Sequence, residues 1–432
     1  MISAPNHRQL LSGNKFRLLA VLFLSGLLSC SAGKKPSYLT NQGGNKTEVQ
    51  NEEKLGSEDK LKQEKEIKEQ MGTNLPVVVN DFHVALFLPF SLHKDAERGT
   101  RDFIIREGVL DYYQGILLAL DSLEREGIKL KLHVLDTRKD SLTTVKQLNK
   151  PEMTEMDLII GPLDYPSFEA VSNFALKHDI PVVSPFSMPS KSRLPNPMAF
   201  YASGSLKSYG GTLAKYLLAK TGKFQVLYIG DGSTTDKEVA AGLEEGLKGS
   251  EVKFIKRKYV KDAKFRPLLQ KDSVINVVIV ASDDEQTVKS ATWAYRSQDP
   301  EITDEDYTVE LIGLDTWLGF RDPNFKLWEN ASLKVLSNFY TFDTDSNYLN
   351  FKNLYRAKFE IPASNLSLKG FDQMLFFGHA LLAFGKQFPA YVQDTEFAGT
   401  GMDFYWHFNG TQVVNQAVRM LKFYDYRFHP LR

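Results

Sequence analysis

Short apolar runs alternate with amphipathic stretches along much of the chain. The runs have the length of buried strands, whereas in the stretches between them apolar side chains recur every three or four residues, which predicts helices. In the first half we predict strands over 83–90 ("HVALFLPF"), 129–137, 157–162 ("DLIIGP") and 180–187, and helices over 109–126, 140–150 and 166–178. Strands that alternate with helices through short connections are typical of a parallel, doubly wound sheet.

The same pattern restarts after "NPMAFYASGS" (196–205). Here we predict strands over 224–231, 252–260, 274–282, 308–315 and 333–340, and helices over 206–220, 235–248, 284–297, 347–359 and 369–386. The chain ends with "FYWHF" (404–408), an Asn409-Gly410 turn and "AVRMLKFYDY" (417–426), which we interpret as a hairpin because Asn-Gly between two alternating runs favours one. The sequence therefore predicts two successive α/β halves of similar plan.

The N-terminus has the features of a secretory signal. Arg8, Lys15 and Arg17 precede an apolar run over 18–28 that is too short to span a bilayer comfortably. The run ends in Leu27, Leu28 and Ser29, which resembles a bacterial lipobox, directly before Cys30, the single cysteine of the chain. We expect residues 1–29 to be a lipoprotein signal peptide and Cys30 to carry the lipid that anchors the protein to a membrane.

Residues 30–80 differ sharply in composition from residues 81–432. They are polar, alternate in charge and contain too few aliphatic residues to form a core, so we expect a flexible charged tether, with a transient helix over 57–70. Such a coil spans roughly 40 Å. Because the chain has 53 basic and 53 acidic residues and no basic stripe, nucleic acid is a poor candidate for a partner.

Five motifs between residues 84 and 317 resemble a known family. "VALFLPF", "GVLDYYQGILLALDSL", "IIGP", "VVSPFS" and "ELIGLDTW" are similar, in order, to the type I periplasmic binding proteins, and most of all to branched-chain amino-acid receptors of ABC transporters. The resemblance implies an α/β fold of two Rossmann-like lobes joined by three crossings, near 203–206, 335–339 and 406–412, with a ligand cleft between them. We assign 81–205 plus 337–408 to lobe 1 and 206–336 plus 409–432 to lobe 2.

Ligands of open α/β sheets bind beyond the carboxyl ends of the strands. The hydroxyl and backbone N–H groups of Ser184, Phe186 and Ser187 could hold an anionic oxygen there, and Asp315 could hold a cation. The candidate ligand-binding residues are Phe90, Asp164, Tyr165, Ser184, Phe186, Ser187, Met188, Asp231, Asp315 and Trp317. The aromatic members would supply apolar walls.

Several positions depart from the amino-acid receptors that the chain resembles. The resemblance implies a hydroxyl shortly after the "GP" motif and another after "SP", where this chain has Tyr165 and Met188. Asp164 adds a negative charge where a ligand carboxylate would need a positive one, and like charges repel strongly in a poorly hydrated site. Asp315 matches the acid that the family uses for an α-amine. The motifs thus imply the fold more strongly than they imply amino-acid specificity.

No motif indicates catalysis, a cofactor or a metal. "IGDGSTTD" (229–236) lacks the full phosphate-binding pattern and is interpreted as a plain turn. The acids of "SDDEQ" (282–286) stand where they would cap a helix. The aromatic end "FYDYRFHPLR" is expected to be core and lobe-crossing strand, with a partner surface as the alternative. We therefore expect a protein that is not an enzyme.

Two functions remain open. The first is a periplasm-facing, lipid-anchored solute-binding protein that closes on a small polar ligand and serves a permease of an ABC-type uptake system or a sensor. The second is an envelope scaffold or regulator that uses the same fold to contact another envelope protein, such as a cell-wall synthase. Ser31 after the cysteine favours the outer membrane of a Gram-negative bacterium over its inner membrane.

Overall fold

The computed structural model describes residues 81–93, 95, 97–186, 195–260, 263–271, 273–294 and 307–431. The chain divides into two compact units, 1–79 and 80–432, and all of the described residues lie in the second. The signal peptide, Cys30, the tether and its predicted helix therefore lie outside the described residues. Among the helices that are described, none is both long and apolar enough to cross a membrane.

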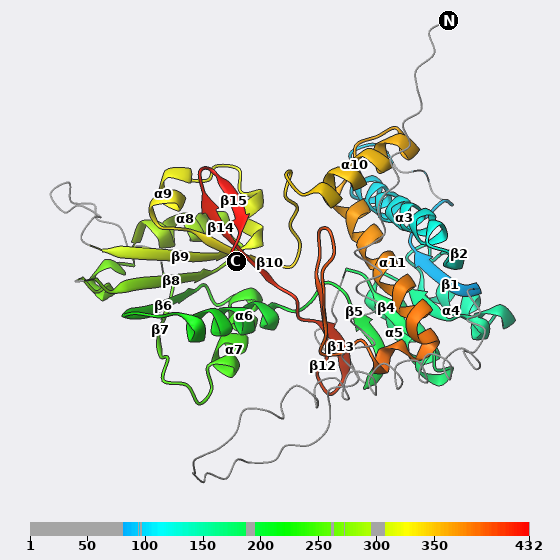
Figure 1. The fold of residues 1–432 in the computed structure, drawn as a ribbon, viewed down its shortest axis with the longest axis horizontal. Helices are drawn as coiled ribbons and strands as arrows, with labels where there is room; N and C mark the ends of the chain where they lie inside the picture. Colours follow the sequence, from blue (N-terminus) through cyan, green and yellow to red (C-terminus); the bar gives the residue numbers. More distant parts are fainter. Residues whose placement is uncertain are drawn as a thin grey trace, which may run out of the picture. The chain divides into compact units, whose positions relative to one another are not determined.

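The first sheet has eight strands in the order β11-β12-β13-β5-β4-β3-β1-β2 (Figure 1). The strands β1 to β5 and β13 are parallel to one another, and β12, which is antiparallel to both β13 and β11, forms the edge of the sheet with β11. The strands are β1 (Asp81–Leu88), β2 (Lys129–Asp136), β3 (Leu158–Ile160), β4 (Val182–Ser184), β5 (Asn196–Tyr201), β11 (Glu396–Phe397), β12 (Phe404–Phe408) and β13 (Gln412–Asn415).

Helices cover both faces of this sheet, because strands such as β1 carry apolar side chains on both of their faces. The side chains of β1 alternate, so that Val84, Leu86 and Leu88 enter the core under α3 and α11, whereas Ala85 and Phe87 enter the core under α5. The helices around this sheet are α3 (Arg101–Arg125), α4 (Ser141–Leu148), α5 (Tyr165–Lys177), α10 (Ser346–Phe359) and α11 (Asn365–Phe384), with 3₁₀ turns η1 (Pro151–Glu155) and η5 (Gly385–Ala390).

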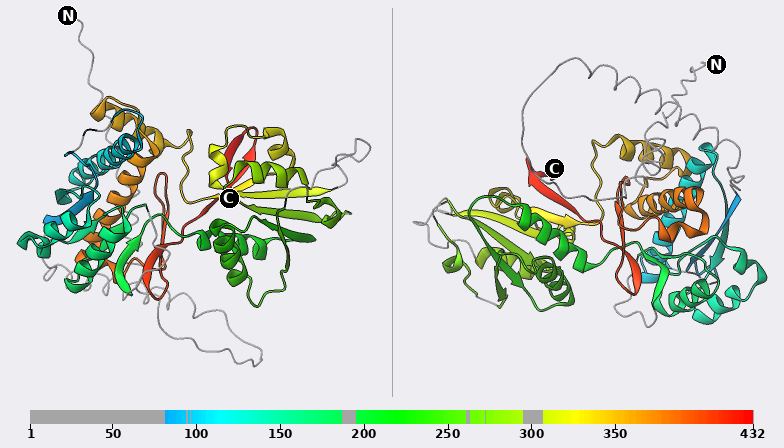
Figure 2. Two further views of the ribbon diagram at one scale, coloured as in Figure 1. Left: turned by 180° about the vertical axis from the view of Figure 1, so that it is seen from behind. Right: turned by 60° about the horizontal axis from the view of Figure 1, so that its bottom comes forward.

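The second sheet has seven strands in the order β15-β14-β10-β9-β8-β6-β7. Its strands are β6 (Phe224–Gly230), β7 (Phe254–Lys258), β8 (Ile275–Ala281), β9 (Thr308–Leu314), β10 (Lys334–Ser337), β14 (Arg419–Tyr424) and β15 (Arg427–Pro430). Figure 2 shows the C-terminal strands β14 and β15 (red) beside the yellow strands, and β14 pairs with β10 in antiparallel register.

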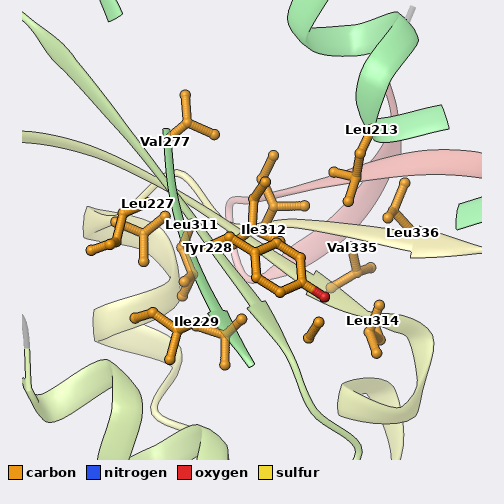
Figure 3. Packing of buried hydrophobic residues seen from close by; sticks show 14 of the residues in the cluster. Leu213, Leu227, Tyr228, Ile229, Val277, Leu311, Ile312, Leu314, Val335 and Leu336 are labelled. Carbon is orange, nitrogen blue, oxygen red and sulfur yellow. The ribbon is translucent and has the colours of Figure 1, made fainter. Parts of the chain in front are cut away.

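The core of the second sheet is formed by its own strands and helices. The side chains of Leu227, Ile229, Leu311 and Val335 are almost completely buried, and they belong to one hydrophobic cluster with Leu213 of α6, part of which Figure 3 shows. The helices here are α6 (Leu206–Ala219), α7 (Thr234–Gly246), α8 (Glu285–Ala294) and α9 (Phe325–Asn330), with 3₁₀ turns η2 (Arg266–Leu268) and η4 (Asp315–Gly319).

The chain passes between the two sheets at 202–205, 338–345 and 416–418, which we call the crossing segments. Hydrogen bonds connect these segments. The Asn338 side chain donates to the Ser203 carbonyl, and the Asn415 side chain donates to the Ala202 carbonyl over 3.3 Å. The first crossing segment is thus hydrogen-bonded both to the second segment and to Asn415, the residue before the third.

The third crossing differs from the prediction near 406–412. The Asn409-Gly410 turn does close a hairpin, but the second arm is β13 and not 417–426. Because β13 pairs with β5 of the first sheet, the chain leaves that sheet only after Asn415. The predicted arm 417–426 instead contributes β14 to the second sheet. The Asn-Gly signal fixes the turn but not the strand with which its second arm pairs.

Candidate functional site

The described candidate residues follow the carboxyl ends of parallel strands, as predicted, but they fall in two groups. Phe90, Asp164, Tyr165, Ser184 and Phe186 follow or end β1, β3 and β4 of the first sheet, whereas Asp231, Asp315 and Trp317 follow β6 and β9 of the second. Ser187 and Met188 lie outside the described residues, as Cys30 does.

The turn after β3 brings α5 close to the sheet. Gly161 has φ +87° and a Cβ there would lie 2.1 Å from the Phe87 carbonyl oxygen, so the first residue of the "GP" motif must be glycine. Asp164 then caps α5 by accepting the Ser167 backbone N–H over 3.0 Å. Its other oxygen, Oδ2, is buried and has no hydrogen-bond partner among the described residues. The charge of Asp164 is thus placed at a helix N-terminus, where the helix dipole favours it.

Two aromatic candidates of this group, Phe90 and Phe186, pack against other rings. Phe90 is 9% exposed and meets Tyr113 edge to face at 5.5 Å between ring centroids. Phe186 meets Tyr112 in the same way at 4.7 Å. Tyr165, by contrast, has 38% of its surface exposed. Of these aromatic rings, Tyr165 is the most accessible to a ligand.

The turn after β4 is held from two sides. The Pro185 carbonyl accepts hydrogen bonds from the Ser203 hydroxyl and from the Gln373 amide, both over 3.2 Å. Gln373 of α11 also accepts the Tyr112 hydroxyl over 2.7 Å. Ser184 itself is buried, and its carbonyl accepts the Ala202 N–H. The loop that would carry an anion site is therefore tied directly to the first crossing segment.

Carboxylates and hydroxyls dominate the carboxyl edge of the second sheet. Asp231 accepts the Ser282 hydroxyl over 2.6 Å and the Ser233 N–H over 2.8 Å. Burial acts to raise the pKa of Asp231, but hydrogen bonds from Ser233 and Ser282 outweigh it, so this pKa lies below its ordinary value. Asp231 is consequently ionised at neutral pH.

Asp283, which the sequence analysis treated only as part of a capping run, belongs to this edge as well. It accepts the Thr235 hydroxyl over 2.5 Å and the Thr316 hydroxyl over 3.0 Å. The capping role falls to its neighbour Asp284, which accepts the Thr287 N–H over 2.7 Å and so confirms the capping interpretation of "SDDEQ". Asp283 directly follows the predicted strand 274–282, the most apolar of the chain, and this position was the signal that could have identified it.

Asp315 lies next to the crossing segments. Its Oδ2 accepts the Tyr209 hydroxyl over 2.7 Å and the Ser337 hydroxyl over 3.4 Å. Its Oδ1 has no hydrogen bond to any described residue and is not fully buried, so it reaches solvent. Burial raises the pKa of Asp315, and the charge of Asp283 acts in the same direction, while Tyr209, Ser337 and Lys369 oppose the rise.

Trp317, two residues later, is fully buried and not an exposed wall. Its indole N–H donates to the Ser282 carbonyl over 3.0 Å, and its ring fills the space that a Cβ on Gly313 would occupy. The tryptophan therefore holds the loop after β8 against the loop after β9, which fixes Asp283 and Asp315 in place.

A lysine that sequence reasoning missed lies beside the second crossing segment. Lys369 of α11 has its Nζ 4.9 Å from the centroid of the Phe339 ring, in the second crossing segment. Burial lowers the pKa of Lys369, and Asp315 is the charge that opposes this. Lys369 had no signal in the sequence, because it stands in a helix that was predicted only for its apolar periodicity.

The "IGDGSTTD" turn after β6 is closed by its own side chain. The carboxylate of Asp236 accepts the Gly232 N–H over 2.8 Å and lies where a side chain on Gly230 would stand, so the "IGDGSTTD" turn is already filled, as its interpretation as a plain turn requires. In the described part of the chain, no group of three or more histidine, cysteine, aspartate or glutamate side chains is placed to hold a metal ion.

Comparison with known proteins identifies the fold. No protein-family model matches the sequence, and no curated protein sequence matches it. Among solved structures, a putative branched-chain amino acid ABC transporter protein from Rhodospirillum rubrum is 13% identical over 81% of this chain and 100% of its own, with a TM-score of 0.59. A branched-chain amino acid ABC-type transporter protein from Rhodopseudomonas palustris is 12% identical over 82% of this chain and 96% of its own, with a TM-score of 0.53.

A third similar structure is an ABC transporter substrate-binding protein from Desulfitobacterium hafniense. It is 16% identical over 81% of this chain and 100% of its own, with a TM-score of 0.52. At these identities the likeness establishes the fold. The resemblance to type I periplasmic binding proteins, seen first in the sequence motifs, is thereby confirmed.

Proposed function

We propose that this chain, which has the type I periplasmic-binding-protein fold, is a lipid-anchored solute-binding protein of the cell envelope. Its two α/β lobes would close on a small polar ligand through the crossing segments and pass the ligand to an ABC-type permease or report it to a sensor. The observation that carries the proposal is the setting of Asp315 at the carboxyl edge of the second sheet.

Asp315 has the properties of a ligand-binding carboxylate. One oxygen is fixed by Tyr209 and Ser337, which orients the group, and the other is left open to solvent. A carboxylate held by two hydroxyls at a strand end can receive a cationic or hydrogen-bond-donating ligand without rearrangement. Asp231 and Asp283 add negative charge to the same edge, which favours a ligand with a positive group.

The similar structures support binding over catalysis. Their names describe substrate-binding or transport proteins for branched-chain amino acids, or for ABC transporters in general. Asp315 stands at the residue that the family resemblance assigns to an α-amine. We therefore propose that this chain binds its ligand and does not transform it, with no cofactor involved.

The anchor is proposed from the sequence. Lipid on Cys30 and the tether over 30–80 would hold the body facing the periplasm, with the outer membrane of a Gram-negative bacterium as the proposed site. Metabolic labelling with a radioactive fatty acid tests this: the full chain should be labelled and Cys30→Ala should not. Equal labelling of the two would remove the anchor from the proposal.

A ligand screen tests the proposed function directly. The full chain, purified in detergent, is heated with members of a panel of amino acids, short peptides, sugars, nucleosides, aromatic acids and cell-wall fragments. A ligand at a hundredfold its dissociation constant stabilises the folded state by about 2.7 kcal/mol, which gives a readable rise in melting temperature. A rise that disappears in Asp315→Asn supports the proposal, and the absence of any rise across the panel contradicts it.

One observation favours the second function, an envelope scaffold or regulator. The C-terminal hairpin places Tyr424 and Tyr426 at the surface with 60% and 67% of their area exposed, while Phe423 between the core strands is buried. Exposed tyrosines on an edge hairpin are suited to a protein partner. In-cell crosslinking from position 427, in the same hairpin, should then capture one envelope protein, and loss of that product in Tyr424→Ser with Tyr426→Ser would assign the contact to the two tyrosines.

A further inference from the structure

Two histidines face one another on the first sheet, apart from the candidate functional site. His83 lies toward the amino end of β1, and His133 lies in β2, the edge strand of the sheet. The His133 Nε2 is 3.2 Å from the His83 Nδ1, and both residues are half-buried. Phe90 and the other candidate residues of this sheet follow the carboxyl ends of its strands instead.

The pairing of β1 with β2 brings the two rings to one face of the sheet. Ala85 and Phe87 enter the core under α5, and His83 shares their face because side chains alternate along a strand. His133 stands beside Ala85 in the parallel register, so it lies on the same face, two residues along the sheet from His83. The backbone register of two core strands, and not the reach of flexible side chains, therefore places the imidazoles together.

The backbone of His83 is also fixed from the side of β3. Asp157, the residue before β3, accepts the His83 N–H on its Oδ2 over 2.8 Å. Its own N–H donates to the His83 carbonyl over 2.8 Å. One of the two imidazoles is thus attached to a residue that is held from both neighbouring strands, and donors that are fixed beforehand bind a ligand at a lower cost in entropy.

The spacing of the two rings differs from that of a straight hydrogen bond. Their centroids are 5.1 Å apart. Since each nitrogen lies about 1.15 Å from its ring centre, a straight N–H···N bond would place the centroids about 5.5 Å apart for the 3.2 Å between these nitrogens. Two imidazoles on one tetrahedral Zn²⁺, with bonds of about 2.05 Å, have nitrogens about 3.3 Å and centroids about 5.2 Å apart. The observed spacing is closer to the second arrangement.

The two rings have the chemistry that a transition-metal ion requires. Imidazole nitrogen suits Zn²⁺, Cu²⁺ and Ni²⁺, and it binds them only when it carries no proton. A neutral imidazole has one such nitrogen, so each ring can turn its lone pair toward the other. Burial lowers the pKa of His133, the charges of His83 and Lys131 act in the same direction, and Glu152 opposes them. His133 is consequently neutral at pH 7.

We propose that His83 and His133 bind a divalent transition-metal ion as a chelate that joins β1 to β2, with Zn²⁺ the ion that fits their spacing best. The described residues place no third histidine, cysteine, aspartate or glutamate there, so water or an added ligand completes the coordination. Two donors held together bind about 10²–10⁴-fold more tightly than either alone. The bound ion ties the edge strand to the sheet and stabilises the folded first lobe. This site is independent of the ligand proposed for Asp315.

Isothermal titration of ZnCl₂ into the full chain in detergent, in a non-chelating buffer near neutral pH, tests the inference. We expect wild type to bind Zn²⁺, and His83→Gln and His133→Gln each to weaken that binding roughly a hundredfold. His379→Gln is the matched control, because His379 belongs to the same lobe but its ring contacts a carboxylate, that of Glu126 over 2.8 Å, and not a second imidazole. The control should bind Zn²⁺ as tightly as wild type.

Electron paramagnetic resonance with one equivalent of Cu²⁺ counts the nitrogens bound to the ion. The spectrum of wild type and of His379→Gln should show coupling to two imidazole nitrogens, and either single variant should lose that pattern. Circular dichroism verifies that each variant is folded, and the wild-type spectrum decides the test even where a variant is not. Absence of Zn²⁺ binding in wild type, coupling to a single nitrogen, or full affinity in a folded His83→Gln or His133→Gln protein overturns the inference and leaves a hydrogen bond between two neutral rings.

Discussion

The Tyr209 hydroxyl donates a hydrogen bond to Asp315 Oδ2 over 2.7 Å, and this bond joins the first helix of the second lobe to the end of its fourth parallel strand. Tyr209 also accepts the Asn338 N–H over 3.3 Å, so a single hydroxyl contacts both the candidate ligand-binding acid and the second crossing segment. The Tyr209 hydroxyl thus links Asp315 to the second crossing segment.

Tyr209→Phe should destabilise the protein. Asp315 would lose its shortest hydrogen bond while staying largely buried, at a cost of about 1–3 kcal/mol at pH 7. Because the pKa of Asp315 is raised in the folded protein, its ionised form is the disfavoured one, and the cost should shrink as acid protonates it. Urea unfolding at pH 7 and pH 4 measures both values.

Tyr113→Phe is the control for this change. Tyr113 packs edge to face on Phe90, and its hydroxyl has no hydrogen bond to a described residue. Its removal should alter the free energy of unfolding by less than about 0.5 kcal/mol. A Tyr209→Phe protein as stable as the control at pH 7 would contradict the role given to the Tyr209 hydroxyl.

Asp372 should make the protein less stable as the pH rises through about 6. Burial raises the pKa of Asp372 to about 6, although the N–H groups of Thr400, Gly401 and Met402 and the charge of Arg419 oppose this. The folded state therefore binds the proton more tightly than the unfolded state. The stability contribution is present in acid and is lost as the carboxyl ionises, by about 2 kcal/mol between pH 4 and pH 7.

Asp372→Asn isolates this effect from other titrating groups. Urea unfolding gives the free energy of unfolding of both proteins. The value for wild type minus the value for the variant should fall by about 2 kcal/mol between pH 4 and pH 7. A difference that stays constant with pH would show that Asp372 does not titrate there.

Arg419 should be a strong stabilising contact between the lobes. Its guanidinium binds both oxygens of Asp403 over 2.6 Å and also donates to the carbonyls of Tyr340 and Gly399. Arg419→Ala would leave the Asp403 charge without its partner, at a cost of about 3–5 kcal/mol. Lys139→Ala, which removes an exposed ion pair with Asp102, should cost less than about 1 kcal/mol. Equal effects in thermal unfolding would show that the Arg419 contacts contribute no more than a surface pair.

Gly161→Ala should be far more damaging than Gly222→Ala. Both glycines have positive φ, +87° and +86°, so both substitutions carry the cost of a left-handed alanine, about 1–2 kcal/mol. Only at Gly161 does the new methyl group meet a backbone oxygen, while nothing lies within 4 Å of it at Gly222. The additional cost should be about 1–3 kcal/mol. If the two variants had the same melting temperature, this account of the "GP" turn would be contradicted.

Much of the fold could be predicted because its signals are local. The periodic runs anticipated β1, α5, β8 and α10 to within a residue or two at most ends, since buried strands and amphipathic helices are visible in any short window. The partner of β13 could not be predicted, because the pairing of Gln412–Asn415 with β5 depends on contacts over two hundred residues apart in sequence.

The candidate site was less predictable for the same reason. Asp315 could be named from the strand that precedes it, but Tyr209 and Lys369 come from helices whose patterns report only on the core. Trp317 was expected to supply an apolar wall of the ligand site because it follows a strand end, yet a 3₁₀ turn folds its ring into the space beside Gly313. Strand ends locate an edge of a sheet, and tertiary packing decides which side chains are open there.

The central claim is that Asp315 receives a small polar ligand at the carboxyl edge of the second sheet. Its most direct test is a calorimetric titration of the tightest-binding compound from the screen into wild type, Asp315→Asn and Asp322→Asn, the last being an acid of the same lobe with 90% of its side chain exposed. We predict at least a tenfold loss of affinity in Asp315→Asn and none in Asp322→Asn. Equal affinity in all three proteins would contradict the claim.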